Sequence, residues 1–237
     1  MKHFKILMAM LISFAAVTTL NAETKRYEVK SGIIEYAITE SGNMMGITTE
    51  TKGTAKTVFK DWGNVELQSE ESTTTTMGQK EHEKESTKID NGKVFVVNFD
   101  QTVIYEYTPA LLAQSEHKDL VKTGKEMLAS VGAKKIGEEN FMGYTCEIWQ
   151  VMHAKLWIYK GIMLKTVSEI MGMKHTTVAT KIALDESISE DDLKLPNFPI
   201  KKATAQMLHE NEDEDVPQIT PEQMEQMKKM MNNYPAK

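Results

Sequence analysis

The methionines near the end of the sequence are the first residues whose type and spacing could do chemistry. The chain has 17 methionines, and three of the last recur three and four residues apart, which places them on one side of a helix. Thioether sulfur is a preferred ligand for Cu(I), and a histidine lies upstream. The candidate metal site therefore consists of Met224, Met227, Met231 and His209. The alternative is that these methionines fill an apolar helix face that docks onto the domain or a partner.

Cysteine and the remaining histidines offer less. Cys146 is the only cysteine, so no disulfide can form within the chain. In an oxidising compartment, a lone thiol is buried, paired with another molecule, or reactive. The bulky neighbours Tyr144 and Ile148 favour a buried and inert thiol. His153 and His175 lie about one hairpin apart and could approach each other, but their positions favour ordinary surface histidines.

Catalysis and nucleic-acid binding find little support in the composition. The sequence contains no Gly-x-Ser-x-Gly motif and no glycine-rich phosphate loop, and carboxylates are too frequent to single out a pair. The formal net charge is −6, and Arg26 is the only arginine. Phosphate contacts need clustered cations, so nucleic acid is an unsuitable partner. We therefore expect a protein that is not an enzyme and carries no cofactor.

The beginning of the chain is typical of a secretory signal peptide. Lys2 and Lys5 precede an apolar run from Ile6 to Leu20, and a small-residue cleavage site follows at Ala22. An uncleaved anchor is the alternative, but about fifteen apolar residues fall short of the roughly 20 that span a bilayer. We predict a signal peptide over 1–22, export to the periplasm and no transmembrane segment after cleavage.

The elements that must position any site alternate between strands and helices. Residues 26–107 read as a β-meander, with a bulge or bend at Gly32 and a two-residue turn at Asn91-Gly92. The polar stretch 68–88 predicts a hairpin that turns near Met77-Gly78 and projects into water or forms a sheet edge, with disorder as the alternative. Apolar residues at helical spacing predict helices over 111–131.

The second half of the chain predicts more strands and then a tail. Residues 143–198 read as successive strands, with a turn at Lys160-Gly161. Residues 202–219 form an acidic linker, and 220–237 form a Met-rich amphipathic helix that begins with a capping box.

An apolar ligand cavity is the functional interpretation of the aromatic residues. The strand around Trp157 is apolar on both sides, so both of its faces need a cover. One cover could be the helices over 111–131, and the other could be a ligand held in a concave apolar space. These positions are first of all core candidates. The predicted lining of this space is Tyr36, Phe59, Trp149, Trp157, Leu164 and Val178.

Several motifs in the second half resemble a known group. They are Gly143-Tyr144-Thr145-Cys146-Glu147, the strand around Trp157, Thr176 to Thr180, and Leu195-Pro196-Asn197-Phe198. Together they resemble exported bacterial proteins of uncharacterised function with the LolA/LolB-like lipoprotein-carrier fold. The resemblance covers about residues 26–201. It implies an incomplete antiparallel β-barrel that wraps around helices and holds acyl chains on its concave side. It transfers no individual site residue.

The sequence therefore predicts an α+β fold, in which a curved antiparallel sheet or incomplete barrel over 23–201 wraps short helices and a helical tail follows. We expect a soluble periplasmic carrier of an apolar or lipid-like ligand, with an envelope protein as a further candidate partner. Two alternatives stay open. One is a periplasmic copper-binding protein that uses the Met-rich helix, and the other is a non-catalytic structural or interaction module.

Overall fold

One broad sheet dominates the computed structural model, which describes residues 25–44, 47–108, 128, 132–170 and 172–204. Two 3-10 turns, η1 (Asp61–Gly63) and η3 (Asp191–Leu193), accompany its strands. The strands are β1 (Gly32–Met44), β2 (Ile47–Lys60), β3 (Val65–Thr76), β4 (Gln79–Asp90), β5 (Lys93–Asn98), β6 (Val103–Tyr107), β7 (Lys134–Phe141), β8 (Tyr144–Val151), β9 (Ala154–Tyr159), β10 (Ile162–Ile170), β11 (Met173–Leu184) and β12 (Ile200–Lys202).

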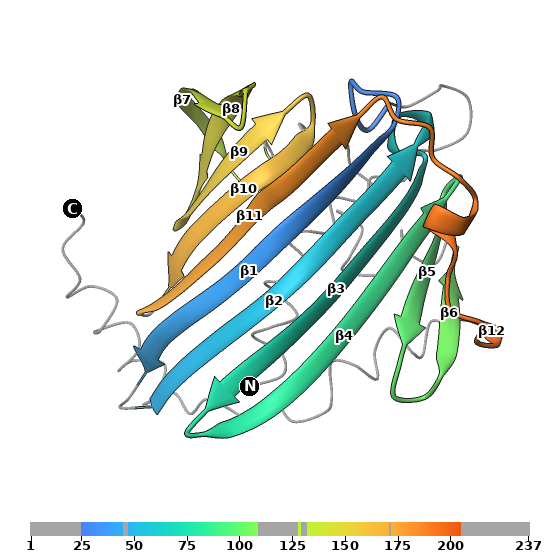
Figure 1. Ribbon diagram of the computed structural model, residues 1–237, viewed down its shortest axis with the longest axis horizontal. Coiled ribbons are helices and arrows are strands. Elements are labelled where there is room, and N and C mark those ends of the chain that lie inside the picture. The colour runs from blue at the N-terminus through green and yellow to red at the C-terminus, as the bar shows by residue number, and fades with distance from the viewer. Residues whose placement is uncertain (1–24, 45–46, 109–127, 129–131, 171, 205–237) are drawn as a thin grey trace.

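The sheet consists of two meanders that join along their first and last strands. Its order is β12-β6-β5-β4-β3-β2-β1-β11-β10-β9-β8-β7. The long strands β1 and β11 therefore lie in the middle, and the outer strands twist away from them (Figure 1). All the pairs are antiparallel except β12 with β6, which is parallel.

Four hairpins share the same turn chemistry. Met77-Gly78, Asn91-Gly92, Met142-Gly143 and Lys160-Gly161 all have positive φ at both turn residues. This geometry matches the right-handed twist of the flanking strands, and a glycine at the second position adopts it at little cost. The predicted polar hairpin is confirmed. Among the described strands, β5 pairs only with Ser86–Asp90 of β4, so residues 79–85 of β4 have a described partner on the β3 side alone.

The predicted α+β class is wrong for the part of the chain that the structure describes. The elements there are strands and 3-10 turns, none is an α-helix, and the sheet is open. The predicted helices over 111–131, except Leu128, and over 220–237 lie outside the described residues. The helical spacing of apolar residues over 111–131 was not enough to predict the fold class, because most of the described residues belong to long paired strands. No helix among the described residues is long and apolar enough to cross a membrane.

The start of the first meander also differs from the prediction. Residues 26–30 are bends, and the first strand begins only at Gly32. The β-bulge lies further on, where the register between β1 and β11 shifts between Glu35 and Tyr36. The change of pattern at Gly32 therefore coincides with the start of β1, and the bends precede it, because residues 26–30 bond to turns rather than to a neighbouring strand.

Among the residues that the structure describes, the core forms three clusters. The largest cluster contains Tyr27, Ile34, Phe59, Leu164 and Trp157 among its buried members. A second forms around Val58 and Leu193, and a third around Leu128 and Leu156. Buried side chains on both sides of the strands explain why the strand around Trp157 is apolar on both sides.

Candidate functional site

One face of the central strands carries the candidate site. Ile34, Tyr36 and Ile38 alternate along β1 and are all at most 7% exposed. Alternate residues of a strand share a face, and so do residues directly opposite each other on paired strands. Ala55 on β2 and Ala179 on β11 therefore lie on the same side as Tyr36. We call this side the Tyr36 face.

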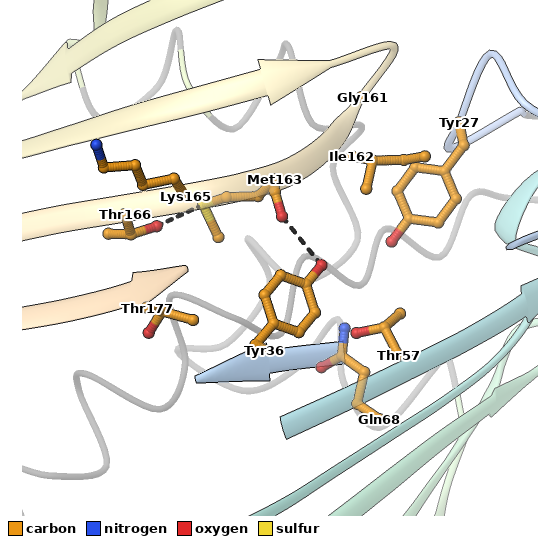
Figure 2. A pocket seen from close by; sticks show the side chains of 10 residues that line it. All are labelled: Tyr27, Tyr36, Thr57, Gln68, Gly161, Ile162, Met163, Lys165, Thr166 and Thr177. Carbon is orange, nitrogen blue, oxygen red and sulfur yellow. Dashed lines mark hydrogen bonds between the residues drawn. The ribbon is translucent and has the colours of Figure 1, made fainter. Parts of the chain in front are cut away.

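A small pocket opens beside Tyr36. Figure 2 shows Tyr36 pointing toward β10, where its hydroxyl donates a 3.0 Å hydrogen bond to the carbonyl oxygen of Met163. Burial raises the pKa of Tyr36, so the hydroxyl stays protonated. The volume is about 20 Å³, which holds about one water molecule. The lining residues are Tyr27, Tyr36, Thr57, Gln68, Gly161, Ile162, Met163, Lys165, Thr166 and Thr177.

The wall of this pocket is held by a segment that crosses the end of the sheet, residues 26–30, which we call the strap. Arg26 and Tyr27 donate backbone hydrogen bonds to the carbonyl of Trp62, and Glu28 donates one to that of Lys160. The strap therefore connects η1 with the β9–β10 turn. Gly161 permits this approach, because a Cβ there would lie 2.8 Å from the Arg26 carbonyl oxygen.

A buried ion pair between Arg26 of the strap and Glu66 of β3 holds the strap in place. Arg26 Nη1 lies 3.2 Å from Glu66 Oε2, and the two side chains are 4% and 1% exposed. Glu66 also accepts hydrogen bonds from the Tyr27 hydroxyl at 2.7 Å and from Gln68 Nε2 at 2.6 Å. Tyr27 and Gln68 both line the pocket, so the ion pair positions two of its walls.

Two carboxylates stand directly opposite each other on the same side of the sheet. Glu70 on β3 pairs in register with Glu85 on β4, and Ala55 links Glu70 to the Tyr36 face. Burial and then the charge of Glu85 raise the pKa of Glu70 to about 7. Burial and then Glu83 raise the pKa of Glu85. This part of the sheet therefore carries carboxylates that resist deprotonation.

Four of the predicted lining residues come together in the largest core cluster. Tyr36, Phe59, Trp157 and Leu164 all belong to it, and of these Tyr36 alone lines the described pocket. The Phe59 ring is fully buried and lies 4.5 Å from the Tyr27 ring. The Trp157 indole nitrogen donates to Glu139 at 3.2 Å. Their role in holding a ligand stays a prediction.

The other two predicted residues lie apart. Trp149 packs against the cluster around Leu128 and Leu156 rather than against the largest one. Val178 is half-buried, and it lies one position from Thr177 and Ala179, on the opposite side of β11. In a regular strand Val178 would share a face with Ile182, but the bulge between them shifts the alternation by one residue.

The thiol and the histidines lie where simple packing explains them. Cys146 is fully buried, as predicted, and burial raises the pKa of its thiol to about 11. His175 is on β11, and its Nδ1 lies 3.4 Å from Glu40 Oε2. His153 lies in the β8–β9 turn, beyond the intervening strand β10, so the structure does not pair the two histidines.

The metal candidates Met224, Met227, Met231 and His209 lie outside the described residues. In the part of the chain that is described, no group of three or more His, Cys, Asp and Glu side chains could hold a metal ion. The copper-binding hypothesis thus stays a prediction.

Sequence reasoning missed the strap, Tyr27 and the Glu70–Glu85 pair. Tyr27 and Val29 alternate with charged residues as a strand would, so the sequence carries no signal for the bends that form the strap. The carboxylate pair did have a signal, because a two-residue turn at Met77-Gly78 fixes the register of the hairpin.

Comparison with known proteins gives remote structural likeness and nothing closer. No family model matches the chain, and no curated protein matches it. An uncharacterised conserved protein from Thermus thermophilus aligns with a TM-score of 0.39 and 10% identity, over 71% of this chain and 90% of that one. A DUF1329 family protein from Desulfovibrio piger aligns with a TM-score of 0.34 and 11% identity, over 73% and 92%.

A LolA superfamily protein from Nitrosomonas europaea aligns with a TM-score of 0.32 and 10% identity, over 79% of this chain and 97% of that one. The TM-scores are all below 0.5, so no site residue is transferred from these proteins. A protein of the LolA superfamily, the group that the sequence motifs resemble, is thus among the solved structures to which this chain is remotely similar.

Proposed function

We propose that this protein is a non-catalytic binding or carrier protein that holds an apolar or lipid-like ligand against the Tyr36 face of its sheet. The observation that carries the proposal is the pocket at Tyr36. Aromatic and aliphatic groups from Tyr27, Tyr36, Ile162 and Met163 enclose it, together with a few hydroxyl and amide groups. Ligand sites are typically concave and mostly apolar, with a small number of polar groups that fix orientation.

The size of the pocket defines how binding would work. A volume of about 20 Å³ admits about one water molecule, so an alkyl chain enters only when lining side chains move apart. Met163 is half-buried and unbranched, and such thioether side chains adapt their shape easily. We expect the ligand to displace Met163 and to contact the apolar cluster around Tyr36 and Leu164.

The chemistry of the surrounding groups supports binding rather than catalysis. The Cys146 thiol is buried, and its pKa of about 11 keeps it protonated at neutral pH. The Tyr36 hydroxyl is engaged with the Met163 carbonyl and stays protonated. A periplasmic location and an envelope protein partner belong to the same proposal, and the signal-peptide pattern over 1–22 supports the location.

Binding of a neutral fluorescent dye tests the proposal. Nile red should bind the purified protein with increased fluorescence, and a Thr57→Leu variant should weaken this binding by about fivefold or more, because the larger side chain fills the pocket. Thr54→Leu is the matched control. It makes the same change on the exposed side of β2, three residues away, and should leave binding unchanged. Thermal unfolding of both variants checks that they fold.

Two results together would contradict the proposal: no saturable dye binding, and no lipid in an organic extract of gently purified protein. The interaction-module hypothesis would then be favoured. Equal dye binding by wild type and Thr57→Leu would place the dye elsewhere and remove the pocket from the proposal.

A further inference from the structure

A row of polar side chains crosses the Tyr36 face next to the pocket. Directly opposite pairs connect β10, β11, β1, β2, β3 and β4 in turn, so the members share one side of the sheet. We call this set the polar row. Its members are Ser168, His175, Glu40, Thr51, Thr74 and Glu81.

The polar row is continuous with the pocket. Ser168 lies two residues after Thr166 on β10, and His175 lies two residues before Thr177 on β11. Thr166 and Thr177 both line the pocket, and Figure 2 shows them on neighbouring strands beside Tyr36. A ligand that occupies the pocket would therefore reach the polar row within one further pair of residues.

Ser168 is the unusual member of the row. Its residue is 2% exposed, and its hydroxyl oxygen is buried with no hydrogen-bond partner. Buried hydroxyls in native proteins almost always have a partner, because an unpaired one costs free energy. Ser168 is directly opposite His175, so its hydroxyl faces the same space as the imidazole. An unsatisfied hydroxyl at this position points to a polar ligand group.

The charges of the row indicate which polar group fits. Glu40 Oε2 lies 3.4 Å from His175 Nδ1, which is long for a charged hydrogen bond, and the two side chains are 16% and 12% exposed. His175 Nε2 lies 3.0 Å from the Thr177 hydroxyl. The site thus offers a carboxylate and hydroxyl oxygens as acceptors.

One lysine of these strands, Lys165 on β10, lines the pocket, and its ammonium lies 4.2 Å from the centroid of the Trp157 ring. The other cationic side chains of these strands occupy the opposite face. Lys52, Lys80 and Lys174 are each one position away from a member of the row, so they project from the other side of the sheet. Of the six residues that make up the polar row, His175 alone could carry a positive charge. An anionic ligand group would meet the Glu40 carboxylate, whereas an ammonium group would be attracted to it.

We propose that the polar row recognises a protonated primary amine at the polar end of an amphiphilic ligand whose apolar part lies in the pocket. The oxygen acceptors that its N–H donors would meet on this face belong to Glu40, Ser168 and Thr177. This inference rests on the proposed function, because it assigns the polar end of the same ligand.

Competition between amphiphiles of equal chain length tests the inference. Decylamine, decanoate, decanol and decyltrimethylammonium are each titrated, below micelle formation, against Nile red on the full-length protein. Decylamine should displace the dye at a concentration about tenfold lower than decanoate or decanol, and lower than the trimethylammonium compound, which lacks N–H donors.

Variants locate the effect. Ser168→Ala and Glu40→Gln should each reduce the preference for decylamine about fivefold or more, while displacement by decanol stays unchanged. Ser168→Ala removes an unpaired hydroxyl, so it should fold at least as well as the wild type. Glu35→Gln is the control, because it removes a carboxylate from the other face of the same strand.

The outcomes separate the two proposals. Equal displacement by decylamine and decanol, equal displacement by decylamine and the trimethylammonium compound, or a preference that survives both variants would each overturn the amine site while leaving an apolar carrier intact. If Nile red does not bind the wild type at all, the proposed function fails and the amine site fails with it.

Discussion

Removing the charge of Glu66 should destabilise the protein strongly. In the Glu66→Gln variant the buried guanidinium of Arg26 loses its counter-charge, although its hydrogen bond to the Gly63 carbonyl at 2.8 Å remains. Breaking a buried ion pair from one side costs about 3–5 kcal/mol, because the remaining charge is left in a low-dielectric site. We expect a loss of this size in the free energy of unfolding. It corresponds to a decrease in melting temperature of about 2–4 °C per kcal/mol.

Urea unfolding followed by the fluorescence of the three tryptophans measures this loss. A double variant, Arg26→Met with Glu66→Gln, should recover most of the stability, since both charges are then gone and the amide oxygen still accepts from Tyr27. The resulting double-mutant cycle should give a coupling energy of about 1–3 kcal/mol.

The matched control for the ion pair is Glu35→Gln. The Glu35–Lys181 pair joins the two central strands, but its side chains are 44% and 66% exposed. Exposed pairs contribute about 0–1 kcal/mol, so this variant should stay close to the wild type. If Glu66→Gln and Glu35→Gln lose the same small amount, the strap is not held by a desolvated ion pair and the reasoning is refuted.

Two further predictions follow from the backbone and the carboxylates. Gly161→Ala should destabilise the protein more than Gly143→Ala. The two glycines have similar φ, +84° and +88°, but only at Gly161 would the new Cβ meet the strap. Equal losses of stability in urea unfolding would contradict this contact. The pKa of Glu70 is raised to about 7, so the folded state holds a proton that the unfolded state releases at lower pH, and the stability that Glu70 contributes falls as the pH rises from about 4.5 to 7. The difference in unfolding free energy between Glu70→Gln and the wild type should therefore shift in favour of the variant by on the order of 1–3 kcal/mol from pH 5 to pH 8. The control Glu71→Gln, on the other face, should show no such change. A difference for Glu70→Gln that does not vary with pH would exclude the raised pKa.

Local turn chemistry made several parts of the fold predictable. Asn91-Gly92, Lys160-Gly161 and Met77-Gly78 were identified as turns from residue type alone, and each joins two strands in the structure. The burial of Cys146 followed equally simply from its bulky neighbours. These features depend on a few consecutive residues, whose backbone preferences are similar in most proteins.

The candidate site was less predictable, because its parts come together from distant segments. Tyr36 was identified as a lining residue, whereas its pocket neighbours Tyr27 and Thr177 were not. A single bulge moved Val178 to the other side of β11, and no residue type marks that position. The prediction of an α+β class was wrong for a related reason. It relied on helical spacing in one region, whereas long strands form most of the described chain.

The hairpins follow from local sequence, because each turn sets the register of the two strands beside it. Once Met77-Gly78 is the turn, Glu70 must stand opposite Glu85. Which hairpins lie side by side depends on contacts between distant segments of the chain. The pairing of β1 with β11 and the contact of Arg26 with Glu66 join segments far apart in the chain, and many strands with similar alternation compete for such pairings. The Tyr36 face, its pocket and the polar row form because β11, rather than another strand, pairs with β1 on the side away from β2.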